Sequence, residues 1–400
     1  MSRMRLADLE ARDLDGQRVV VRADLNVPLH DGEVADDTRI RASLPTIRYL
    51  REHGARVVLL SHLGRPKGKP DPAFTLRPVA RVLERELGAP VLFLEDPTSP
   101  EAVRAVRHMP RGGVALAENT RFYPGEEQND PALADRFAAL GDMFVNDAFG
   151  TAHRAHASTE AIAHRLKPAV SGFLLEKELR FLGEAVDHPA RPFVAILGGA
   201  KISGKIDLVE ALLPKVDRIL IGGAMACTFF KAMGLEVGRS LVENDRLDMA
   251  RDLIATAGDK LVLPVGAMVG DRLAADATTR EVARDAIPAD MAMFDIDATS
   301  IAQFTAIITA ARTVIWNGPM GVFETPPFDR GTLGVAQALA AATRAGATTI
   351  VGGGDSAAAV TAAGLDDAVT HVSTGGGASL EFLEGKPLPG VRALDPRPEG

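Results

Sequence analysis

Basic and polar side chains follow the short apolar runs in the first half of the sequence, at the points where strands would end. They are Arg22, Asp24 and Asn26 after the first run, His62 and Arg65 after the second, Arg121 after the fourth, and His153, Arg154 and His156 after the fifth. Arg39 opens the first long helical stretch. Gathered guanidinium groups repel one another unless an anion neutralises them, and they form forked hydrogen bonds with phosphate and carboxylate. This pattern predicts a site for a small substrate with several negative charges.

Neighbouring carboxylates offer an alternative interpretation of these arginines. Asp24, Glu118 and Asp147 lie close enough in the sequence to neutralise single arginines. Several guanidinium groups at equivalent strand ends favour the anion site over separate pairs. The histidines match no metal-ligand spacing and have no companion cysteine, so we interpret them as hydrogen-bonding or packing residues. Among them, His62 is the one expected to touch the substrate.

Glycines follow the apolar runs in the second half of the sequence. They are Gly198 and Gly199, Gly222, Gly318 after Asn317, Gly353 and Gly354, and Gly375 and Gly376. Glycine at a strand-to-helix turn lets backbone N–H groups approach phosphates at a helix N-terminus. Several such turns in one half of a chain predict a nucleotide site.

Two known phosphate-loop patterns match this half only in part. Gly199–Lys205 reads GAKISGK, but Ile206 stands where the Walker A pattern needs Ser or Thr to hold magnesium. Gly352–Ala357 reads G-x-G-x-x-A and lacks the later acidic residue that would bind a dinucleotide's ribose. Both of these nucleotide-binding classes are therefore disfavoured.

Three further residues of this half carry charge that suits a nucleotide. Lys201 and Lys205 are four residues apart, so we expect them on one face of a helix behind the glycine turn. Asp355 heads an expected helix, where it is either the N-cap or a magnesium ligand.

Alternating strand-like and helix-like stretches must position these residues. The strand-like runs are Val19–Val21, Val57–Leu60, Val91–Leu94, Val114–Ala117, Met143–Val145, Phe193–Leu197, Ile219–Ile221, Val314–Trp316, Thr349–Val351 and Val369–Val372. The helix-like stretches of the first half are Ile40–His53, Leu76–Leu87 and Pro131–Leu140. This alternation predicts an α/β fold with mostly parallel sheets, in which ligands lie beyond the carboxyl ends of the strands.

One helical stretch, Ser171–Leu182, is expected to join two lobes. It reads SGFLLEKELRFL, with apolar and charged residues interleaved as in a partly buried helix, and Pro168 precedes it. We expect a hinge helix over 171–190 between an N-terminal lobe at 1–170 and a nucleotide-binding lobe at 191–384. The alternative is one more helix inside a single large domain.

The composition limits the class of protein. Of the 400 residues, 46% are hydrophobic and 24% are charged, which is typical of a globular chain. A net charge of −8 and the lack of interleaved aromatic residues argue against nucleic-acid binding. No apolar run approaches the roughly 20 residues of a membrane span, and the start lacks a secretory pattern, so we expect a cytoplasmic protein. The single cysteine, Cys227, is expected to be a buried small hydrophobic residue.

Eight sequence motifs together resemble one known family. They are VVVRADLNVPL, LLSHLGRPKGK, ENTRF, VNDAFGTAHRAHAST, GFLLEKEL, LGGAKISGKI, WNGPMGVFE, and VGGGDSAA with THVSTGGGASLEFLEGKPLPG. In order and from end to end, the chain resembles the phosphoglycerate kinase family. The resemblance implies two Rossmann-like three-layer lobes, a monomer, and a reversible transfer of phosphate from 1,3-bisphosphoglycerate to ADP that gives 3-phosphoglycerate and ATP.

The resemblance also implies a role for individual residues. The implied acid-binding residues are Asp24, Leu25, Asn26, Arg39, His62, Leu63, Gly64, Arg65, Arg121 and Arg154. The implied nucleotide-binding residues are Gly198, Gly199, Lys201, Lys205, Gly222, Asn317, Glu324, Gly353, Gly354, Asp355 and Ser356, with Glu324 at the ribose and Asp355 as the Mg²⁺ ligand. The implied catalytic residues are Arg39, Lys201, Lys205, Gly375 and Gly376. Residues from about 385 to 400 are implied to return to the N-terminal lobe.

The chain departs from the family at the segment around Met293 and Asp297, where the family usually has glycines, so the adenine contacts are open. Because the nucleophilic carboxylate is ionised near neutral pH, we expect no general base. We also expect the lobes to close when both ligands are bound and so exclude water. The alternative functions are another carboxylate kinase and a non-catalytic protein that binds phosphorylated metabolites.

Overall fold

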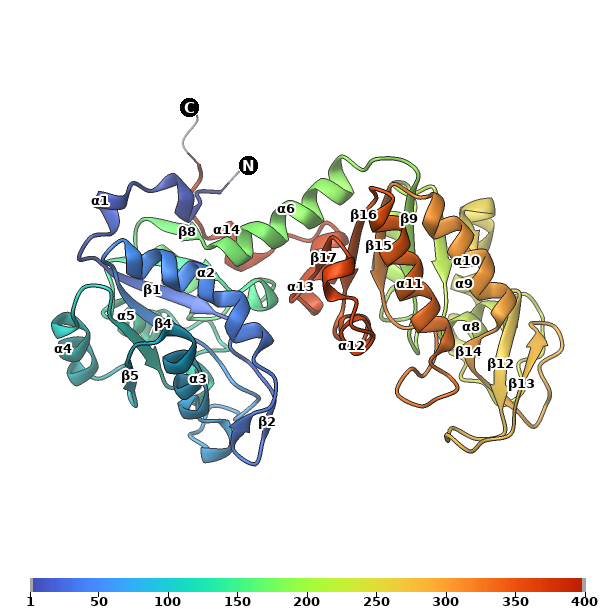
Figure 1. Ribbon diagram of the computed structural model, residues 1–400, viewed down its shortest axis with the longest axis horizontal. Helices are drawn as coiled ribbons and strands as arrows, with labels where there is room; N and C mark the ends of the chain where they lie inside the picture. The colour runs from blue at the N-terminus through green and yellow to red at the C-terminus, as the bar shows by residue number, and fades with distance from the viewer. Residues whose placement is uncertain (1–2, 398–400) are drawn as a thin grey trace. The chain divides into compact units, whose positions relative to one another are not determined.

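A computed structural model describes residues 3–397 of the chain, which form two compact units (Figure 1). Unit 1 comprises residues up to 180 together with those from 387 onward, and unit 2 comprises residues 181–386. Helix α6 (Phe173–Asp187) contains the point at which the chain passes from one unit to the other. The hinge role expected for this helix stays a prediction.

Unit 1 is built on a six-stranded parallel sheet with the order β5-β6-β4-β1-β7-β8. The strands are β5 (Val91–Leu94), β6 (Val114–Ala117), β4 (Arg56–Leu60), β1 (Arg18–Ala23), β7 (Met143–Asp147) and β8 (Ala169–Ser171). Strands β6 and β7 are buried along their whole length, so both faces of the sheet are covered. Because β6, β4, β1 and β7 are neighbours, the loops at their carboxyl ends lie side by side.

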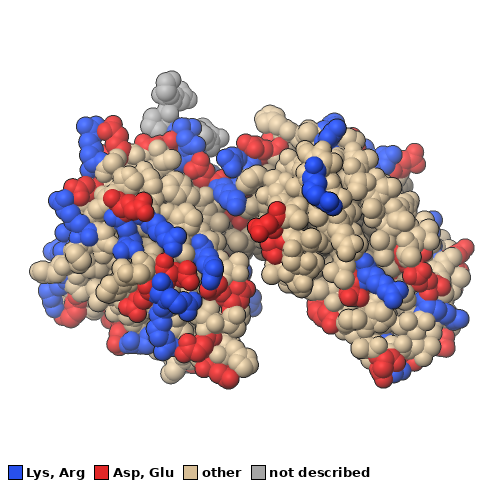
Figure 2. Space-filling view, viewed as in Figure 1, with Lys and Arg blue, Asp and Glu red and all other residues tan. Residues whose placement is uncertain are grey.

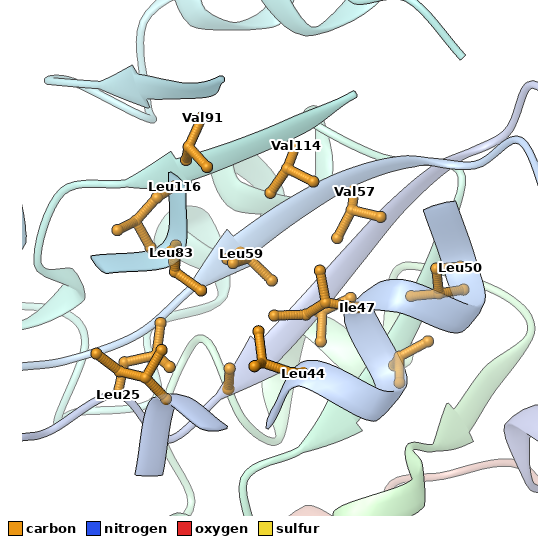
Figure 3. Packing of buried hydrophobic residues seen from close by; sticks show 14 of the residues in the cluster. Leu25, Leu44, Ile47, Leu50, Val57, Leu59, Leu83, Val91, Val114 and Leu116 are labelled. Carbon is orange, nitrogen blue, oxygen red and sulfur yellow. The ribbon is translucent and has the colours of Figure 1, made fainter. Parts of the chain in front are cut away.

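Helix α2 packs on this sheet and carries Arg39. The helices of unit 1 are α1 (Ala11–Leu14), α2 (Thr38–Glu52), α3 (Arg77–Leu87), α4 (Pro100–His108), α5 (Pro131–Ala138), the start of α6, and α14 (Pro389–Arg392); β2 (Leu29–His30) and β3 (Glu33–Val34) form a small hairpin. Leu44 and Ile47 of α2 point toward Leu59 of β4 (Figure 3). Each such buried side chain contributes about 1.5–3 kcal/mol. This packing fixes the helix on which Arg39 is the second residue.

The C-terminal segment belongs to unit 1. Asn146 Nδ2 donates to the carbonyl oxygen of Gly390 at 3.0 Å, and Gly390 N donates to the carbonyl oxygen of Ala152 at 2.9 Å. Asp395 N donates to the carbonyl oxygen of Ala169 at 2.9 Å. Residues 398–400 of the expected tail lie outside the described residues.

Unit 2 contains a second six-stranded parallel sheet, with the order β11-β10-β9-β15-β16-β17. Its strands are β11 (Leu261–Val262), β10 (Arg218–Ile221), β9 (Phe193–Leu197), β15 (Thr313–Asn317), β16 (Thr348–Gly352) and β17 (His371–Val372). Its helices are α7 (Ile206–Leu212), α8 (Met225–Ala232), α9 (Leu247–Ala257), α10 (Ala298–Ala310), α11 (Arg330–Arg344), α12 (Gly354–Ala362) and α13 (Gly377–Leu383). The predicted α/β fold with mostly parallel sheets is therefore confirmed.

A separate antiparallel sheet in unit 2 was not predicted from the sequence. It has the order β13-β12-β14, with β13 (Thr279–Ala283), β12 (Gly266–Gly270) and β14 (Ala292–Ile296). Strand β13 has no buried residue, and β12 begins and ends with glycine. Neither strand therefore shows a strong hydrophobic pattern in the sequence.

Charged side chains of both signs are intermixed on the face of unit 1 shown in Figure 2, and the visible face of unit 2 is mostly uncharged. Neither face shows the broad basic surface that is typical of nucleic-acid binding. Among residues 3–397, no helix has both the length and the apolar character that crossing a bilayer requires.

Candidate active site

The carboxyl ends of β1, β4, β6 and β7 gather most of the side chains predicted to bind an acid. The positive charges of Arg22, Arg121 and Arg39 all lower the pKa of His62, and the charge of Arg154 lowers the pKa of His156. Charges perturb one another's protonation appreciably only at short range, so these groups lie close together. We call the following residues the cationic cluster: Arg22, Arg39, His62, Arg121, Arg154 and His156.

Asp24 anchors Arg39 within this cluster. Arg39 Nη1 donates to both carboxylate oxygens of Asp24, at 3.2 and 3.1 Å. The Asp24 side chain is 7% exposed, whereas that of Arg39 is 37% exposed. Arg39 is therefore paired with a carboxylate, as the alternative interpretation of the arginines expected. A guanidinium carries five N–H donors, so the pair leaves donors for an anionic ligand.

Arg121 is buried and ties two further loops to the cluster. Its Nη1 donates to the carbonyl oxygen of Gly64 at 2.7 Å, and Gly64 N donates to Asn26 Oδ1 at 2.9 Å. Burial lowers the pKa of the Arg121 guanidinium from its usual value, and the charge of Arg154 adds to this effect although Glu127 opposes it. An added anion would therefore stabilise the charged form of Arg121.

Several buried polar atoms at the cluster lack a hydrogen-bond partner among the residues that the structure describes. They are Thr120 Oγ1, His156 Nδ1 and Arg121 Nε, the last of which nevertheless forms an ion pair with Glu127 Oε1 at 3.3 Å. A buried polar group without a partner costs about 1–3 kcal/mol, and native proteins keep few of them. Oxygen atoms of a bound acid would supply the missing partners.

Three of the residues that the resemblance implies to bind the acid do not present their side chains with the cationic cluster. Arg65 is exposed and is not among the charged groups that act on His62. The side chains of Leu25 and Leu63 belong to the hydrophobic core of unit 1. Any contact of these two leucines with a ligand therefore comes from the main chain, and Leu25 N already donates to Ser61 Oγ at 2.9 Å.

A cavity of about 330 Å³ lies at the carboxyl edge of the parallel sheet of unit 2. Its lining includes residues predicted to bind the nucleotide, from three loops, and one predicted catalytic glycine from a fourth. They are Gly198, Gly199, Lys205, Asn317, Gly353, Gly354, Asp355 and Ser356, with Gly376 as the catalytic glycine. Strands β9, β15 and β16 are neighbours, which brings the glycines that follow them to one edge. Helix α12 begins at Gly354, so the positive end of its dipole faces this cavity.

Lys205 and Asn317 provide polar groups inside this cavity, which we call the phosphate cavity. Lys205 Nζ donates to the Asn317 carbonyl oxygen at 3.1 Å and to Asn317 Oδ1. Burial lowers the pKa of Lys205 to about 8, and the charge of Asp355 opposes that shift. Asn317 Nδ2 is buried without a partner among the described residues. Both groups are suited to phosphate oxygens.

The expected placement of Lys201 and Lys205 on one helical face is wrong. Helix α7 begins only at Ile206, and Lys201 is exposed in the preceding turn. Glu243 holds that turn, because its carboxylate accepts hydrogen bonds from Ser203 N at 3.1 Å and from Ser203 Oγ. Lys201 does not line the phosphate cavity. Its positive charge instead helps to lower the pKa of Glu243.

Two predicted glycines also lie behind the cavity wall. An added Cβ on Gly222 would lie 2.3 Å from Met320 Sδ, so this glycine serves close packing. Gly375 N donates to Ser373 Oγ at 3.1 Å. Their neighbours Gly223 and Gly376 line cavities, and Gly376 is itself one of the predicted catalytic residues. The sequence thus placed these two turns correctly to within one residue.

A larger cavity of about 670 Å³, which we call the nucleoside cavity, adjoins the phosphate cavity and shares Gly199 and Asp355 with it. Glu324 and Met293 line this cavity. Asp297 does not: it caps α10 by accepting a hydrogen bond from Ser300 N at 3.0 Å. Of the two residues that differ from the family pattern, Met293 therefore lines the nucleoside cavity and Asp297 does not.

Most residues that line the nucleoside cavity were not predicted from the sequence. They include Arg239, Leu241, Leu273, Ala292 and Phe294. Leu273, Ala292 and Phe294 come from the antiparallel sheet and its loops, and Arg239 and Leu241 come from the connection between α8 and α9. No glycine turn or charge pattern marks these residues.

Cys227 lies beside this cavity and is not reactive. It is fully buried, and burial raises the pKa of its thiol to about 11. Its Sγ contacts Met293 Sδ at 3.5 Å. The expectation that Cys227 is a buried hydrophobic residue is confirmed.

Asp355 is exposed and lines both cavities. Over residues 3–397, no group of three or more His, Cys, Asp or Glu side chains could hold a metal ion by itself. Magnesium, however, is commonly bound by one or two carboxylates together with substrate phosphates. The single open carboxylate of Asp355 therefore fits a metal ion that arrives with a nucleotide.

The glycine turns make a testable prediction at Gly198. An added Cβ at this position would lie 2.1 Å from the carbonyl oxygen of Pro319 and 2.7 Å from that of Gly318. Overpacking of this kind costs about 1–3 kcal/mol, so Gly198→Ala should raise the KM for the nucleotide by about tenfold. Gly204→Ala is the matched control, because a Cβ there meets no atom within 4 Å. Equal nucleotide KM values for the two variants would contradict a need for close backbone approach.

Comparisons with known proteins agree on one family. A family model described as phosphoglycerate kinase matches residues 8–386. The phosphoglycerate kinase of Chloroflexus aurantiacus is 59% identical over 391 residues, covering 96% of this chain and 98% of that protein. The cytosolic phosphoglycerate kinase of Triticum aestivum is 53% identical over 387 residues, covering 96% of each.

A solved structure supports the same relationship. Phosphoglycerate kinase from Coxiella burnetii has a TM-score of 0.88 and 43% sequence identity, with 98% of this chain and 99% of that chain covered. Both the sequence and the fold are thus matched over nearly the full length, and the chain belongs to the phosphoglycerate kinase family.

Proposed function

We propose that the cationic cluster binds 3-phosphoglycerate or 1,3-bisphosphoglycerate, and that the two cavities of unit 2 bind ADP or ATP with Mg²⁺. As a member of its family, the chain is a glycolytic kinase that transfers a phosphoryl group between 1,3-bisphosphoglycerate and ADP. The observation that carries the residue assignment is the separation of chemistry: guanidinium groups gather in one unit, and glycine turns with a lysine gather in the other.

In unit 1, the acid would replace missing hydrogen bonds and neutralise charge. Arg39, Arg121 and Arg154 would share its negative oxygens, and His62 would add a hydrogen bond. In the direction of ATP use, the nucleophile is the carboxylate of 3-phosphoglycerate, which is ionised near neutral pH. No general base is therefore needed, and alignment with charge neutralisation is the main task of the protein.

In unit 2, the nucleotide phosphates would lie over the glycine turns of the phosphate cavity. The N-terminus of α12, Lys205 Nζ and Asn317 Nδ2 would donate to the phosphate oxygens. When bound at Asp355, Mg²⁺ would neutralise charge on these phosphates. Glu324 would accept hydrogen bonds from the ribose, and the base would occupy the larger cavity next to Met293.

We propose further that the protein acts as a monomer in the cytoplasm. The name of the Triticum aestivum relative, a cytosolic phosphoglycerate kinase, supports the location.

A coupled assay for ADP formation from ATP tests the function. ADP should form only when 3-phosphoglycerate is present. Acetate or aspartate in its place should give no turnover, because neither carries the phosphate that the cationic cluster would hold. Turnover with those acids would support another carboxylate kinase, and binding of 3-phosphoglycerate without ADP formation would support a non-catalytic binding protein.

A further inference from the structure

A buried series of hydrogen bonds lies behind His62. Glu126, Ser158 and Arg22 are each fully buried, and His62 is 4% exposed. The Glu126 carboxylate accepts hydrogen bonds from Ser158 N at 3.0 Å and from Ser158 Oγ. Ser158 Oγ in turn accepts a bond from Arg22 Nε at 2.9 Å, and Arg22 Nη2 lies 3.1 Å from His62 Nδ1. Four residues from distant parts of the sequence thus form one connected series.

The contact between Arg22 and His62 determines which ring nitrogen of the histidine carries hydrogen. A guanidinium has only N–H donors and no acceptor. His62 Nδ1 must therefore accept this hydrogen bond and carries no hydrogen. In a neutral imidazole the hydrogen then resides on Nε2, which makes Nε2 a donor.

The surroundings of His62 also keep the ring neutral. Burial is the main cause that lowers the pKa of His62 well below 6.5, and the positive charges of Arg22, Arg121 and Arg39, with His156, lower it further. Protonation would place a hydrogen on Nδ1, directly against the guanidinium of Arg22. The neutral form is therefore favoured throughout the physiological pH range.

Glu126 provides the charge that keeps Arg22 in this place. Burial lowers the pKa of Arg22, and the charges of Glu126 and Asp24 oppose that shift. Ser158 carries no charge and connects the carboxylate to the guanidinium. Without Ser158, Arg22 Nε would lose a buried acceptor. Nη1 would keep its hydrogen bond to the carbonyl oxygen of Ala23, but the guanidinium plane would be held at one edge fewer and could rotate relative to His62.

We propose that Glu126, Ser158 and Arg22 are positioning residues that hold His62 as a neutral Nε2–H tautomer, so that it presents one hydrogen-bond donor to an oxygen of the phosphorylated acid. The proposal rests on the proposed placement of that acid at the cationic cluster. It assigns Arg22 to the support of the site, whereas the sequence pattern grouped it with the arginines that meet the anion.

Nitrogen NMR of protein labelled with ¹⁵N-histidine tests the tautomer without any ligand or variant. The His62 signals are assigned from their absence in His62→Gln. We expect the pattern of a neutral ring with hydrogen on Nε2 from pH 5 to pH 8. A cationic ring at pH 7, or hydrogen on Nδ1, would overturn the proposal.

Ser158→Ala then tests the supporting residues. We expect mixed tautomers of His62 and a Kd for 3-phosphoglycerate that rises about tenfold, with kcat and the KM for ADP nearly unchanged. Thr159→Val is the matched control, because Thr159 is the next buried residue and its Oγ1 has no hydrogen-bond partner among the described residues. An unchanged tautomer and Kd in Ser158→Ala, or equal losses in the two variants, would contradict the positioning role.

Titration with 3-phosphoglycerate separates this inference from the proposed function. The acid should shift the Nε2 signal of His62 in the wild-type protein. If 3-phosphoglycerate binds without shifting the Nε2 signal, the donor role of His62 is contradicted and the proposed function stands. If 3-phosphoglycerate does not bind at all, the placement of the acid is contradicted instead.

Discussion

Arg39→Ala is expected to lower kcat by roughly 100- to 1,000-fold while leaving the Kd for ADP within about twofold. Asp24 holds Arg39 Nη1 at 3.1–3.2 Å, and the partly exposed guanidinium retains donors for an anion. During transfer the charge of the phosphoryl group is spread over its three equatorial oxygens, so a donor aligned with that arrangement affects turnover more than binding of either substrate. Steady-state kinetics with both substrates, together with calorimetry of ADP binding, measures the two effects.

Arg41→Ala provides the matched control on the same helix. Arg41 lies two residues further along α2, is 61% exposed at its side chain and pairs with Asp37. It should have wild-type kcat. Equal losses of kcat and ADP affinity in Arg39→Ala would contradict a role for Arg39 in the transfer step.

Lys205→Met is expected to lower kcat/KM for the nucleotide by about 100-fold or more. The ammonium group lies inside the phosphate cavity, bonded to Asn317, and its replacement removes a charge-assisted donor from a largely buried position. Methionine keeps a similar length and apolar stem, so the surrounding packing should survive. Nucleotide kinetics measure the loss, and an unchanged thermal midpoint separates it from unfolding.

The same lysine predicts a pH dependence. Burial lowers its pKa to about 8, so the free enzyme loses this positive charge as the pH rises through 8. The kcat/KM for the nucleotide should therefore fall above pH 8, since this parameter reports ionisation in the free enzyme. Bound phosphate favours the ammonium form, so kcat should hold to higher pH.

Two variants check that assignment. Lys205→Met should lack the alkaline fall of kcat/KM, and Lys201→Met should keep it because Lys205 remains. An alkaline fall that persists unchanged in Lys205→Met would show that another group titrates.

The parallel sheets were predictable because their central strands are continuous apolar runs. All five strands predicted in the first half are present, and Val19–Val21 lies inside β1. Strand β8 was missed because it has only three residues, and β13 because it is polar and exposed. Short or solvent-facing strands depend on pairing with neighbours, which a local pattern does not reveal.

The candidate site was predictable where chemistry follows a strand directly. Parallel strands bring their carboxyl ends to one edge, so Arg121 and Gly353 could be placed from their positions in the sequence. The turn before α7 was predicted wrongly, because the bonds between Ser203 and Glu243 connect residues 40 positions apart. Glu126 lies outside the quoted motifs, and Ser158 lies inside one without a role assigned to it, so only the folded chain places them behind His62.

A crystal structure with 3-phosphoglycerate and a magnesium complex of a non-hydrolysable ATP analogue would show directly which unit binds each substrate. We expect the acid at Arg39, Arg121 and Arg154 of unit 1, and the analogue's phosphates at Lys205 and Gly353 of unit 2. Both ligands bound to unit 2, or an acid that leaves Arg39 and Arg121 without contact, would contradict this assignment.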